Sequence, residues 1–357
     1  MPYKILIINP GSTSTKVGVY FDDTPYCVTT IRHSVEEIGQ YEQITDQHVF
    51  RRQLVLDWLK TNHIPLQFDA IIGRGGLLKP ISGGVYKVNR KMCEEAFHAV
   101  RKHACNLGCI IAYELAKSQE FSACPAYIAD PVVVDELLPE SRVSGSPLMY
   151  RRAIWHALNQ RAIARRYAKE IGSHYEDLNL IVCHLGGGIS VAAHQKGRAV
   201  DVNNALDGEG PLSPERAGTL PAADLIHLCY SGRYTEDQLK KRIAGQAGLM
   251  AHLGTTDMVE ILKRIENGDE KARLLINAMI YHTAKTIAAE GAVFCGKVDA
   301  ILLTGGIAHS DYITGGISSR VSYLAPVHVF PGEDEIEALA LNALSVLRGE
   351  CEAKEYV

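Results

Sequence analysis

Four apolar strands predicted from the sequence end in glycine, a pattern suited to binding phosphate. The glycines are Gly11, Gly75-Gly76, Gly186–Gly188 and Gly305-Gly306. Glycine lets successive backbone N–H groups approach a ligand closely, and such groups form a concave anion-binding site. A tight turn explains any single one of these segments. Their repetition at four strand ends predicts a ligand that carries several phosphates.

The first of these turns has the richest chemistry. Its donors and its one cation are Asn9, Ser12, Thr13, Ser14 and Lys16. Together they can hold a phosphoryl group. The alternative is a surface turn whose hydroxyls bond their own backbone. The sequence has no G-x-x-x-x-G-K-[ST], which excludes a P-loop protein. It also has no G-x-G-x-x-G after the first strand, which argues against a dinucleotide-binding fold.

Strands alternate with helices along the chain, which indicates an α/β protein. Short apolar runs predict strands at 4–8, 17–20, 69–73, 126–130, 180–183, 189–193, 299–304 and 327–331. Apolar residues at helical spacing, and longer segments between the strands, predict helices within 49–61, 91–119, 151–171, 238–264, 269–294 and 336–347.

Two of the predicted strands begin similar segments. ILIINPGST and LIVCHLGGG align at a constant offset of 175 residues, which places Asn9 opposite His184 and Gly11 opposite Gly186. We therefore expect two structurally related halves; the alternative is two unrelated hairpins. A loop rich in Pro and Gly at 138–149 predicts the boundary between a first domain, 1–146, and a second domain, 147–334.

The composition is that of a soluble globular protein. A length of 357 residues favours two domains. Lys and Arg total 37 against 41 Asp and Glu, which argues against nucleic acid or a membrane surface as a partner. The nine cysteines include no C-x-x-C pair, and we interpret them as reduced thiols of a cytoplasmic protein. No apolar stretch approaches the roughly 20 residues of a membrane helix.

Two segments carry a family resemblance. NPGSTSTK (Asn9–Lys16) resembles the first signature of the acetate and butyrate kinase family, and CHLGGGISVAAH (Cys183–His194) resembles its second. Further matches follow in order: GRGG at 73–76, AD at 129–130, PERAG at 214–218, GLM…TTD at 248–257, LTGGI at 303–307 and PGEDEIEALA at 331–340. The segments WHALNQ and NNALDGEGP resemble the butyrate kinases of this family. The Phe-His-Gly-Thr-Ser-His segment of acetate kinases is matched only at its last position, by His156.

The resemblance implies the fold of the sugar kinase, Hsp70 and actin superfamily: two ribonuclease-H-like domains around a nucleotide cleft. A C-terminal helix, 335–357, is then expected to return to the first domain. The implied reaction transfers a phosphoryl group from ATP to a short-chain fatty acid, above all butyrate, with Mg²⁺, in a homo-oligomer. Alternatives are a branched acid such as isobutyrate, propionate or acetate as acceptor, and a sugar kinase or a chaperone-like ATPase of the same fold.

The same resemblance suggests catalytic residues. A carboxylate acceptor is already ionised at pH 7, so it needs neutralisation of charge rather than a general base. Arg74 and Arg216 match family positions, and a guanidinium can bind a carboxylate or a phosphoryl group through two parallel hydrogen bonds. His184 is expected to donate to the transferring phosphoryl group.

The resemblance also implies the metal and nucleotide residues. Asp130 ends a predicted strand, where its carboxylate can hold Mg²⁺. The second acidic residue is Glu335 or, as the less favoured alternative, Glu333. The residues expected to bind the nucleotide are Asn9, Gly11, Ser12, Ser14, Lys16, Gly186, Gly187, Gly188, Asp257, Gly305, Gly306 and Ile307.

Overall fold

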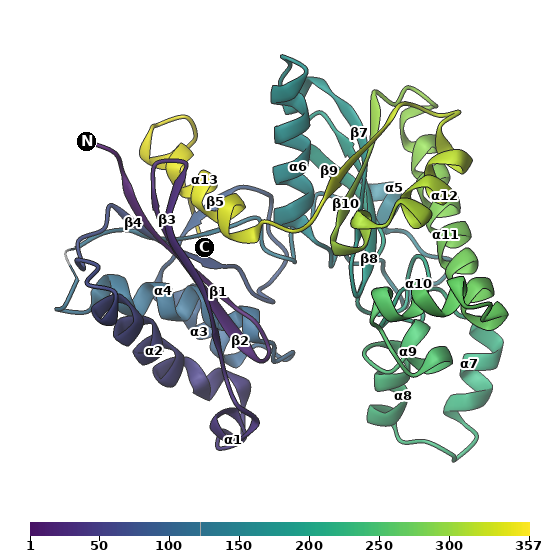
Figure 1. The fold of residues 1–357 in the computed structure, drawn as a ribbon, viewed down its shortest axis with the longest axis horizontal. Helices are drawn as coiled ribbons and strands as arrows, with labels where there is room; N and C mark the ends of the chain where they lie inside the picture. The colour runs from purple at the N-terminus through teal and green to yellow at the C-terminus, as the bar shows by residue number, and fades with distance from the viewer. Residues whose placement is uncertain (122) are drawn as a thin grey trace. The chain divides into compact units, whose positions relative to one another are not determined.

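The computed structural model describes residues 1–121 and 123–357. Contacts along the chain divide it into two compact units, Met1–Val134 with Asp334–Val357, and Asp135–Glu333. Each unit is a mixed β-sheet with helices packed on both faces (Figure 1). The predicted α/β class is confirmed.

The first unit contains a seven-stranded sheet in the order β12-β5-β6-β4-β1-β2-β3. Its strands are β1 (Lys4–Pro10), β2 (Ser14–Phe21), β3 (Thr24–Arg32), β4 (Ala70–Arg74), β5 (Val85–Lys87), β6 (Ala126–Ala129) and β12 (Lys354–Glu355). Its helices are α1 (Val35–Ile38), α2 (His48–Thr61), α3 (Arg90–His98), α4 (Leu107–Lys117) and α13 (Glu335–Leu347). β1, β4 and β6 are parallel neighbours.

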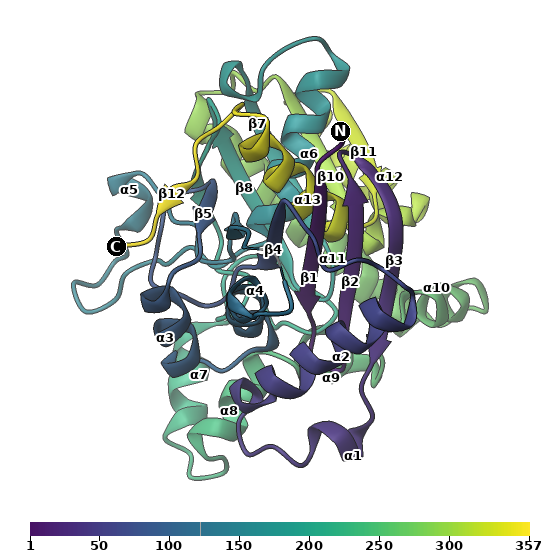
Figure 2. The same ribbon diagram turned by 90° about the vertical axis from the view of Figure 1, so that its left-hand side faces the viewer.

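Helices cover both faces of this sheet. α4 packs on β1, β4 and β6 and is flanked by α2 and α3, while α13 packs on the same three strands (Figure 2). Burial of both faces explains why β1 is a continuous apolar run instead of an alternating one, with Ile5, Leu6, Ile7 and Ile8 fully buried.

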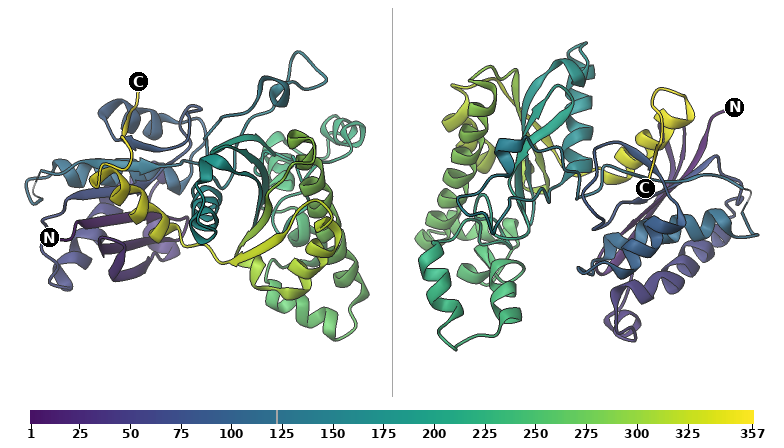
Figure 3. Two further views of the ribbon diagram at one scale, coloured as in Figure 1. Left: turned by 90° about the horizontal axis from the view of Figure 1, so that it is seen from above. Right: turned by 180° about the vertical axis from the view of Figure 1, so that it is seen from behind.

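The second unit contains a five-stranded sheet in the order β11-β10-β7-β8-β9. Its strands are β7 (Asn179–Leu185), β8 (Ile189–Gln195), β9 (Arg198–Val202), β10 (Ala300–Gly305) and β11 (Val327–Pro331). Its helices are α5 (Pro139–Arg142), α6 (Ala157–Glu170), α7 (Ala222–Cys229), α8 (Glu236–Ile243), α9 (Gly248–Leu253), α10 (Met258–Glu266), α11 (Glu270–Glu290) and α12 (Asp311–Val321). α6 packs on β7 and β10, and α11 packs on β7 and β8 (Figure 3).

The two sheets share one strand order. In β6-β4-β1-β2-β3 and in β11-β10-β7-β8-β9, three parallel strands are followed by an antiparallel meander. β1 and β7 begin at Lys4 and Asn179, and β2 and β8 begin at Ser14 and Ile189, which is the 175-residue offset of the sequence alignment. The similarity of the two hairpins therefore extends to whole sheets.

Some elements differ from the predictions. The helix expected at 151–171 begins only at Ala157, because residues 151–156 are irregular and Arg151 binds Asp201 and the carbonyl oxygen of Val202. The sequence analysis missed β3, β5, β9 and β12. β3 has no buried residue, which agrees with its lack of a long apolar run.

Residues 135–146 pack within the second unit. The N–H of Leu138 donates to the carbonyl oxygen of Val200, and Arg142 holds Asp135 through two hydrogen bonds of 2.7 Å. The functional assignment of the two predicted domains stays a prediction.

One backbone contact fixes α4 against the end of β4. A Cβ on Gly108 would lie 2.2 Å from the carbonyl oxygen of Arg74, and a Cβ on Gly73 would lie 2.1 Å from that of Gly108. Only glycine permits so close an approach of helix and strand.

We predict that Gly108→Ala lowers the free energy of unfolding by about 1–3 kcal/mol, because the added methyl group must push α4 away from β4. Urea unfolding of the purified protein measures the effect. Gly315→Ala is the control, since Gly315 is exposed on α12 with open space at its Cβ position. That change should stabilise α12 by about 0.5–1 kcal/mol. Equal stability of Gly108→Ala and the wild type would contradict the packing argument.

Candidate active site

Three parallel strands of the first unit end side by side in polar residues. β1 carries Asn9 near its end, β4 ends at Arg74, and Asp130 directly follows β6. The register of the three strands places these ends next to one another. The carboxyl edge of parallel strands is where open α/β sheets bind ligands.

Arg74, Asn9 and Glu335 form one hydrogen-bonded group. Arg74 Nη1 donates to Glu335 Oε2 at 3.0 Å, and Nη2 lies 2.9 Å from Oε1, so the guanidinium binds the carboxylate in a bidentate manner. Asn9 Nδ2 donates to the same Oε2 at 2.7 Å. Asn9 Oδ1 is buried and has no hydrogen-bond partner among the described residues. Asn9 thus holds Glu335 through its amide nitrogen and has an unused acceptor.

Asp130 adopts an unusual backbone conformation. Its φ is +38°, in the left-handed region that residues other than glycine seldom adopt. Its N–H donates to the carbonyl oxygen of Gly84 at 3.0 Å, and its Oδ1 accepts the N–H of Gly84 at 2.7 Å. Lys354 holds the same loop by donating to the carbonyl oxygen of Gly83 at 2.6 Å. Strain of this kind concentrates at functional sites, which supports a role for the Asp130 carboxylate.

The turn between β1 and β2 presents the predicted phosphate donors. The N–H of Gly11 donates to the carbonyl oxygen of Ser14 at 2.8 Å, which closes a turn that exposes Ser12. Lys16 is exposed on β2 and is paired in register with Asn9. Directly opposed residues of antiparallel strands point to the same face, so Lys16 and Asn9 share a face.

Arg51 is a member of this region that the sequence analysis missed. It lies on α2 with its side chain fully buried beneath the turn. Nη1 donates to the carbonyl oxygens of Gly11 at 2.7 Å and Ser14 at 3.1 Å, and Nη2 donates to that of Ser12 at 3.2 Å. The available signal was its spacing: with Val55, four residues on, Arg51 shares the buried face of α2.

The second unit repeats this arrangement. His184 lies near the end of β7, paired in register with Thr304 of β10, and Glu333 follows β11. His184 Nδ1 lies 2.8 Å from Asn159 Oδ1, an acceptor, so Nδ1 is a donor in this contact. Its Nε2 lies 3.1 Å from Glu333 Oε1. A Cβ on Gly186 would lie 2.9 Å from that Nε2, so the first glycine of the turn makes room for the imidazole.

A second histidine, His156, stacks on His184 and is held by a buried network. The ring centroids of the two histidines are 3.8 Å apart and their planes differ by 9°. His156 Nδ1 lies 2.9 Å from Ser190 Oγ, which accepts from Gln160 Nε2 at 2.8 Å. Gln160 Oε1 lies 3.1 Å from Nε2 of His194.

The far end of this network fixes its direction. Burial lowers the pKa of His194 to about 3, so its ring is neutral at pH 7. Its Nε2–H therefore donates to Gln160 Oε1, and its Nδ1 accepts from the hydroxyl of Tyr175 at 2.6 Å. The amide of Gln160 is thereby oriented so that its Nε2 donates to Ser190 Oγ, which also lies 2.9 Å from His156 Nδ1. The network holds the two stacked rings in one orientation.

Arg216 lies beside the glycine turn after β7. Ser213 Oγ donates to the carbonyl oxygen of Gly187 at 2.8 Å, and the N–H of Arg216 donates to Ser213 Oγ at 3.1 Å. The Arg216 guanidinium pairs with Glu215, with Nη1 3.1 Å from Oε2. Its Nε is buried without a hydrogen-bond partner in the part of the chain that the structure describes.

The predicted adenosine-side residues have separate structural roles. Gly305 has φ +95°, and a Cβ there would lie 2.3 Å from the carbonyl oxygen of Leu185, so β10 and β7 meet closely at their ends. Gly306 begins a short 3₁₀ turn that buries Ile307. Asp257 caps α10 by accepting two backbone N–H groups. A nucleotide role for these residues stays a prediction.

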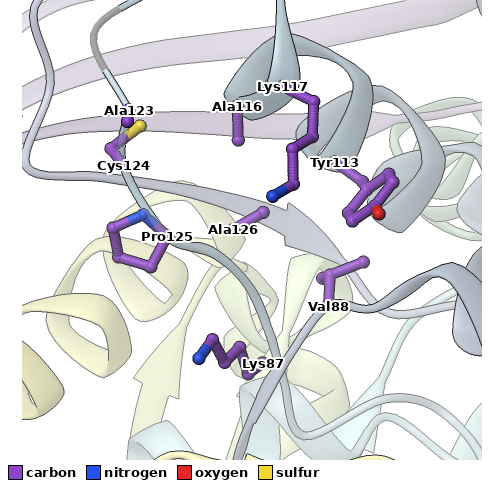
Figure 4. Close-up of a pocket in the computed structure, with 9 residues that line it drawn as sticks. All are labelled: Lys87, Val88, Tyr113, Ala116, Lys117, Ala123, Cys124, Pro125 and Ala126. Carbon is purple, nitrogen blue, oxygen red and sulfur yellow. The ribbon is translucent and has the colours of Figure 1, made fainter.

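A surface hollow of about 360 Å³ lies away from these groups (Figure 4). It opens at the amino end of β6, around Lys87, Lys117, Cys124 and Ala126, whereas Asp130 follows the carboxyl end of that strand. Burial raises the pKa of Cys124 to about 11, so its thiol is protonated and weakly nucleophilic at neutral pH. The Cys124 thiol of this hollow is therefore not an activated nucleophile.

The chain matches known proteins over its whole length. The model of the acetokinase family matches residues 145–315. Proteins named probable butyrate kinase from Bacteroides thetaiotaomicron and Phocaeicola vulgatus are 63% and 52% identical to it, each over 99% of both chains. Among solved structures, Porphyromonas gingivalis acetate kinase superposes with a TM-score of 0.78 at 17% identity, covering 97% of this chain and 100% of that one. A propionate kinase from Francisella tularensis gives 0.76 at 18% identity, covering 95% and 98%.

The fold is that of these kinases, in which two α/β units repeat one strand order. The chain belongs to the acetokinase family. It is therefore a phosphotransferase of the class that uses a carboxyl group as acceptor, as the resemblance implied.

The buried network predicts a pH dependence of stability. The pKa of His194 lies below that of an unfolded histidine, near 6.5, so between the two values the unfolded chain binds one more proton. Stability contributed by neutral His194 is then fully present above pH 6.5 and is lost as the pH falls below it. The slope for this one group is about 1.4 kcal/mol per pH unit.

We predict that His194→Gln flattens this dependence between pH 6.5 and 4. The fluorescence of Trp155, whose ring lies 5.6 Å from that of His194, reports urea unfolding of the second unit in a Trp58→Phe background. His33, whose pKa burial lowers to about 4, belongs to the first unit, so His33→Gln should leave the Trp155 signal unchanged. Equal slopes for His194→Gln and its parent would contradict the assignment.

Proposed function

We propose that this enzyme transfers the γ-phosphoryl group of ATP to butyrate, giving butyryl phosphate and ADP, in a reversible reaction. The observation that carries the proposal is the 63% identity, over 99% of both chains, to a protein named probable butyrate kinase. Isobutyrate, propionate and acetate are the alternative acceptors. One methylene group changes selectivity in an apolar pocket by only about 1–3 kcal/mol, so overlapping substrates are expected.

In this proposal Arg74 neutralises the acceptor. A butyrate ion is already a nucleophile at pH 7, and its main obstacle is repulsion by the nucleotide phosphates. The two-armed pair of Arg74 with Glu335 supports the assignment, because it shows the guanidinium presented in the geometry that a carboxylate requires.

Arg216 and His184 are proposed to act on the transferring phosphoryl group. Charge spreads over the oxygens of this group in the transition state, and fixed cations and N–H donors stabilise it there. The partnerless Nε of Arg216 and the orientation of His184 by Asn159 support these roles. The bond from the β–γ bridging oxygen to phosphorus breaks, a bond from a butyrate oxygen forms, and ADP leaves.

A magnesium ion fits the carboxylate of Asp130. Mg²⁺ prefers oxygen ligands, is commonly held by one or two carboxylates with the substrate phosphates, and when bound neutralises phosphate charge. Asp130 Oδ1 is oriented by the N–H of Gly84, which supports its assignment as ligand. Glu335 is the proposed second ligand, although its oxygens are shared with Arg74 and Asn9. Glu333, the alternative, pairs with His184.

The glycine turns of both units are proposed to bind the nucleotide, and the enzyme is proposed to be cytoplasmic. The turn after β1, with Lys16, and the turns at Gly186–Gly188 and Gly305–Ile307 are proposed to bind ATP and ADP. All nine cysteines are free thiols, which supports the proposed cytoplasmic location. Within residues 1–121 and 123–357, no helix has the length and apolar character needed to span a membrane. The expected homo-oligomer stays a prediction.

A hydroxamate assay tests the proposal. Purified enzyme is incubated with ATP, Mg²⁺, hydroxylamine and each of a panel of C2–C6 acids, including isobutyrate. Acyl hydroxamate should form with the highest kcat/KM for butyrate. Absence of hydroxamate with every acid would overturn the proposal, and ADP release that depends on a hexose would favour a sugar kinase.

We predict that Asp130→Asn lowers kcat by about 100-fold or more, equal to about 2.7 kcal/mol of barrier, because the metal loses a charged ligand. The Mg²⁺ concentration for half-maximal rate should rise as well. Asp69→Asn is the control, since Asp69 precedes β4 at the opposite edge of the same sheet. An unchanged magnesium titration for Asp130→Asn would contradict the assignment.

We predict that Arg74→Lys and Arg216→Lys each lower kcat by about tenfold or more, or about 1.4 kcal/mol, because one ammonium cannot replace a two-armed guanidinium. ADP affinity, measured by calorimetry, should stay close to that of the wild type. Arg142→Lys is the matched control, because Arg142 also holds a carboxylate, Asp135, through two arms. Wild-type rates of acyl phosphate formation in both Lys variants would remove this mechanism.

A further inference from the structure

Arg51 fixes the orientation of two successive peptide groups in the turn after β1. Its Nη1 donates to the carbonyl oxygen of Gly11, and its Nη2 donates to that of Ser12. In a trans peptide the C=O and the following N–H point in opposite directions. The carbonyl groups of Gly11 and Ser12 face the buried guanidinium, so the N–H groups of Ser12 and Thr13 face away from it.

These two N–H groups are available to a ligand. Among the described residues neither finds a protein acceptor, and the side chains of Ser12 and Thr13 are exposed. The next carbonyl, that of Thr13, accepts the N–H of His33 at 2.9 Å, so it too is held on the protein side. The turn therefore presents adjacent N–H donors outward, the arrangement that binds anions.

The charge beneath the turn is not neutralised by its hydrogen-bond partners. Within the described part of the chain, Arg51 donates only to neutral oxygens: the three carbonyls, Thr15 Oγ1 at 3.3 Å, and Gln47 Oε1 at 3.1 and 2.8 Å. Burial lowers its pKa to about 10, which leaves it charged at pH 7. Burial and the Arg51 charge lower the pKa of neighbouring His33 to about 4, so Arg51 is the charged member of the two. A buried cation without a carboxylate attracts an anion above the turn.

We propose that Arg51 is a positioning residue that aims the N–H groups of Ser12 and Thr13 at a phosphoryl group of the nucleotide and supplies a buried positive charge behind them. The inference rests on the proposed function, since it assigns a phosphate-bearing ligand to the first turn. The two terminal nitrogens of Arg51 donate to the carbonyl oxygens of Gly11 and Ser12 at the same time. The single side-chain nitrogen of a lysine cannot hold both peptide groups in this way.

Hydrogen exchange tests the inference without any acceptor acid. Binding of Mg·ATP to the wild type should slow amide exchange in the peptide that contains Ser12 and Thr13. In Arg51→Lys this slowing should be lost. A purely structural Arg51 would lower thermal stability and leave the slowing in place, which would overturn the inference. Absence of slowing in the wild type would overturn it too.

Steady-state kinetics give a second readout. Arg51→Lys should lower kcat/KM for ATP by about tenfold or more and change KM for butyrate by less than about twofold. The control is Arg52→Lys, because the neighbouring Arg52 pairs with Glu114 and points away from the turn's carbonyls. Equal losses in both variants would contradict the inference.

Two further results separate the possible failures. If Arg51→Lys does not fold, Gln47→Met is measured in the same two ways. It removes the acceptor of two Arg51 hydrogen bonds. It should therefore reduce both the slowing of amide exchange by Mg·ATP and kcat/KM for ATP. An unchanged Gln47→Met would then overturn the inference. If ATP slows exchange at the turn but the wild type forms no acyl hydroxamate, the proposed function fails and the role of Arg51 stands.

Discussion

The parallel register of three strands in each sheet determines where the polar side chains of the candidate site lie. β1, β4 and β6 end together, and this brings Asn9, Arg74 and Asp130 to one edge. β7, β10 and β11 do the same for His184 and for Glu333. Near these strand ends, two close backbone contacts require glycine. A Cβ on Gly305 would overlap the backbone of β7, and a Cβ on Gly108 would overlap that of β4. Gly305, one of the strand-end glycines first noticed for their N–H donors, thus also permits close packing, while Gly108 permits the approach of α4 to β4.

Two arginines of the first unit illustrate opposite uses of a guanidinium. Arg74 holds the carboxylate of Glu335 at the strand edge, and in the proposed mechanism it binds an acceptor carboxylate of the same shape and charge. Among the described residues, Arg51 donates only to neutral oxygens beneath the turn, so its positive charge remains available to an anion above the turn. Burial of an uncompensated cation costs free energy, and a protein that tolerates it gains a fixed electrostatic field. Preorganised charge of this kind suits a reaction whose chief obstacle is repulsion between anions.

Local patterns of apolar strands with polar ends predicted the class of fold and the turn at Asn9, whereas Arg74, Asp130 and Glu335 were predicted from the family resemblance. The offset of 175 residues between the two similar segments also related Asn9 to His184. Arg51 was missed because its spacing with Val55 indicates only the buried face of α2, and the turn that accepts its hydrogen bonds lies 40 residues earlier in the chain. Glu335 pairs with Arg74, whereas Glu333 pairs with His184. This difference depends on where β11 ends and where α13 begins. The role of Arg51 and the pairing of the two glutamates both depend on contacts between residues far apart in the sequence.

The central claim is that a carboxylate oxygen of the acid, and not water, forms the new bond to phosphorus, and transfer of an oxygen isotope tests it. Butyrate labelled with ¹⁸O in both carboxyl oxygens is incubated with ATP, Mg²⁺ and enzyme, and hydroxylamine then cleaves the acyl phosphate at its carbonyl carbon. The bridging oxygen leaves with phosphate, so mass spectrometry of the phosphate should find one labelled oxygen per molecule released. Phosphate that carries no label, formed at the rate of ADP release, would show that water is the acceptor and would contradict the account.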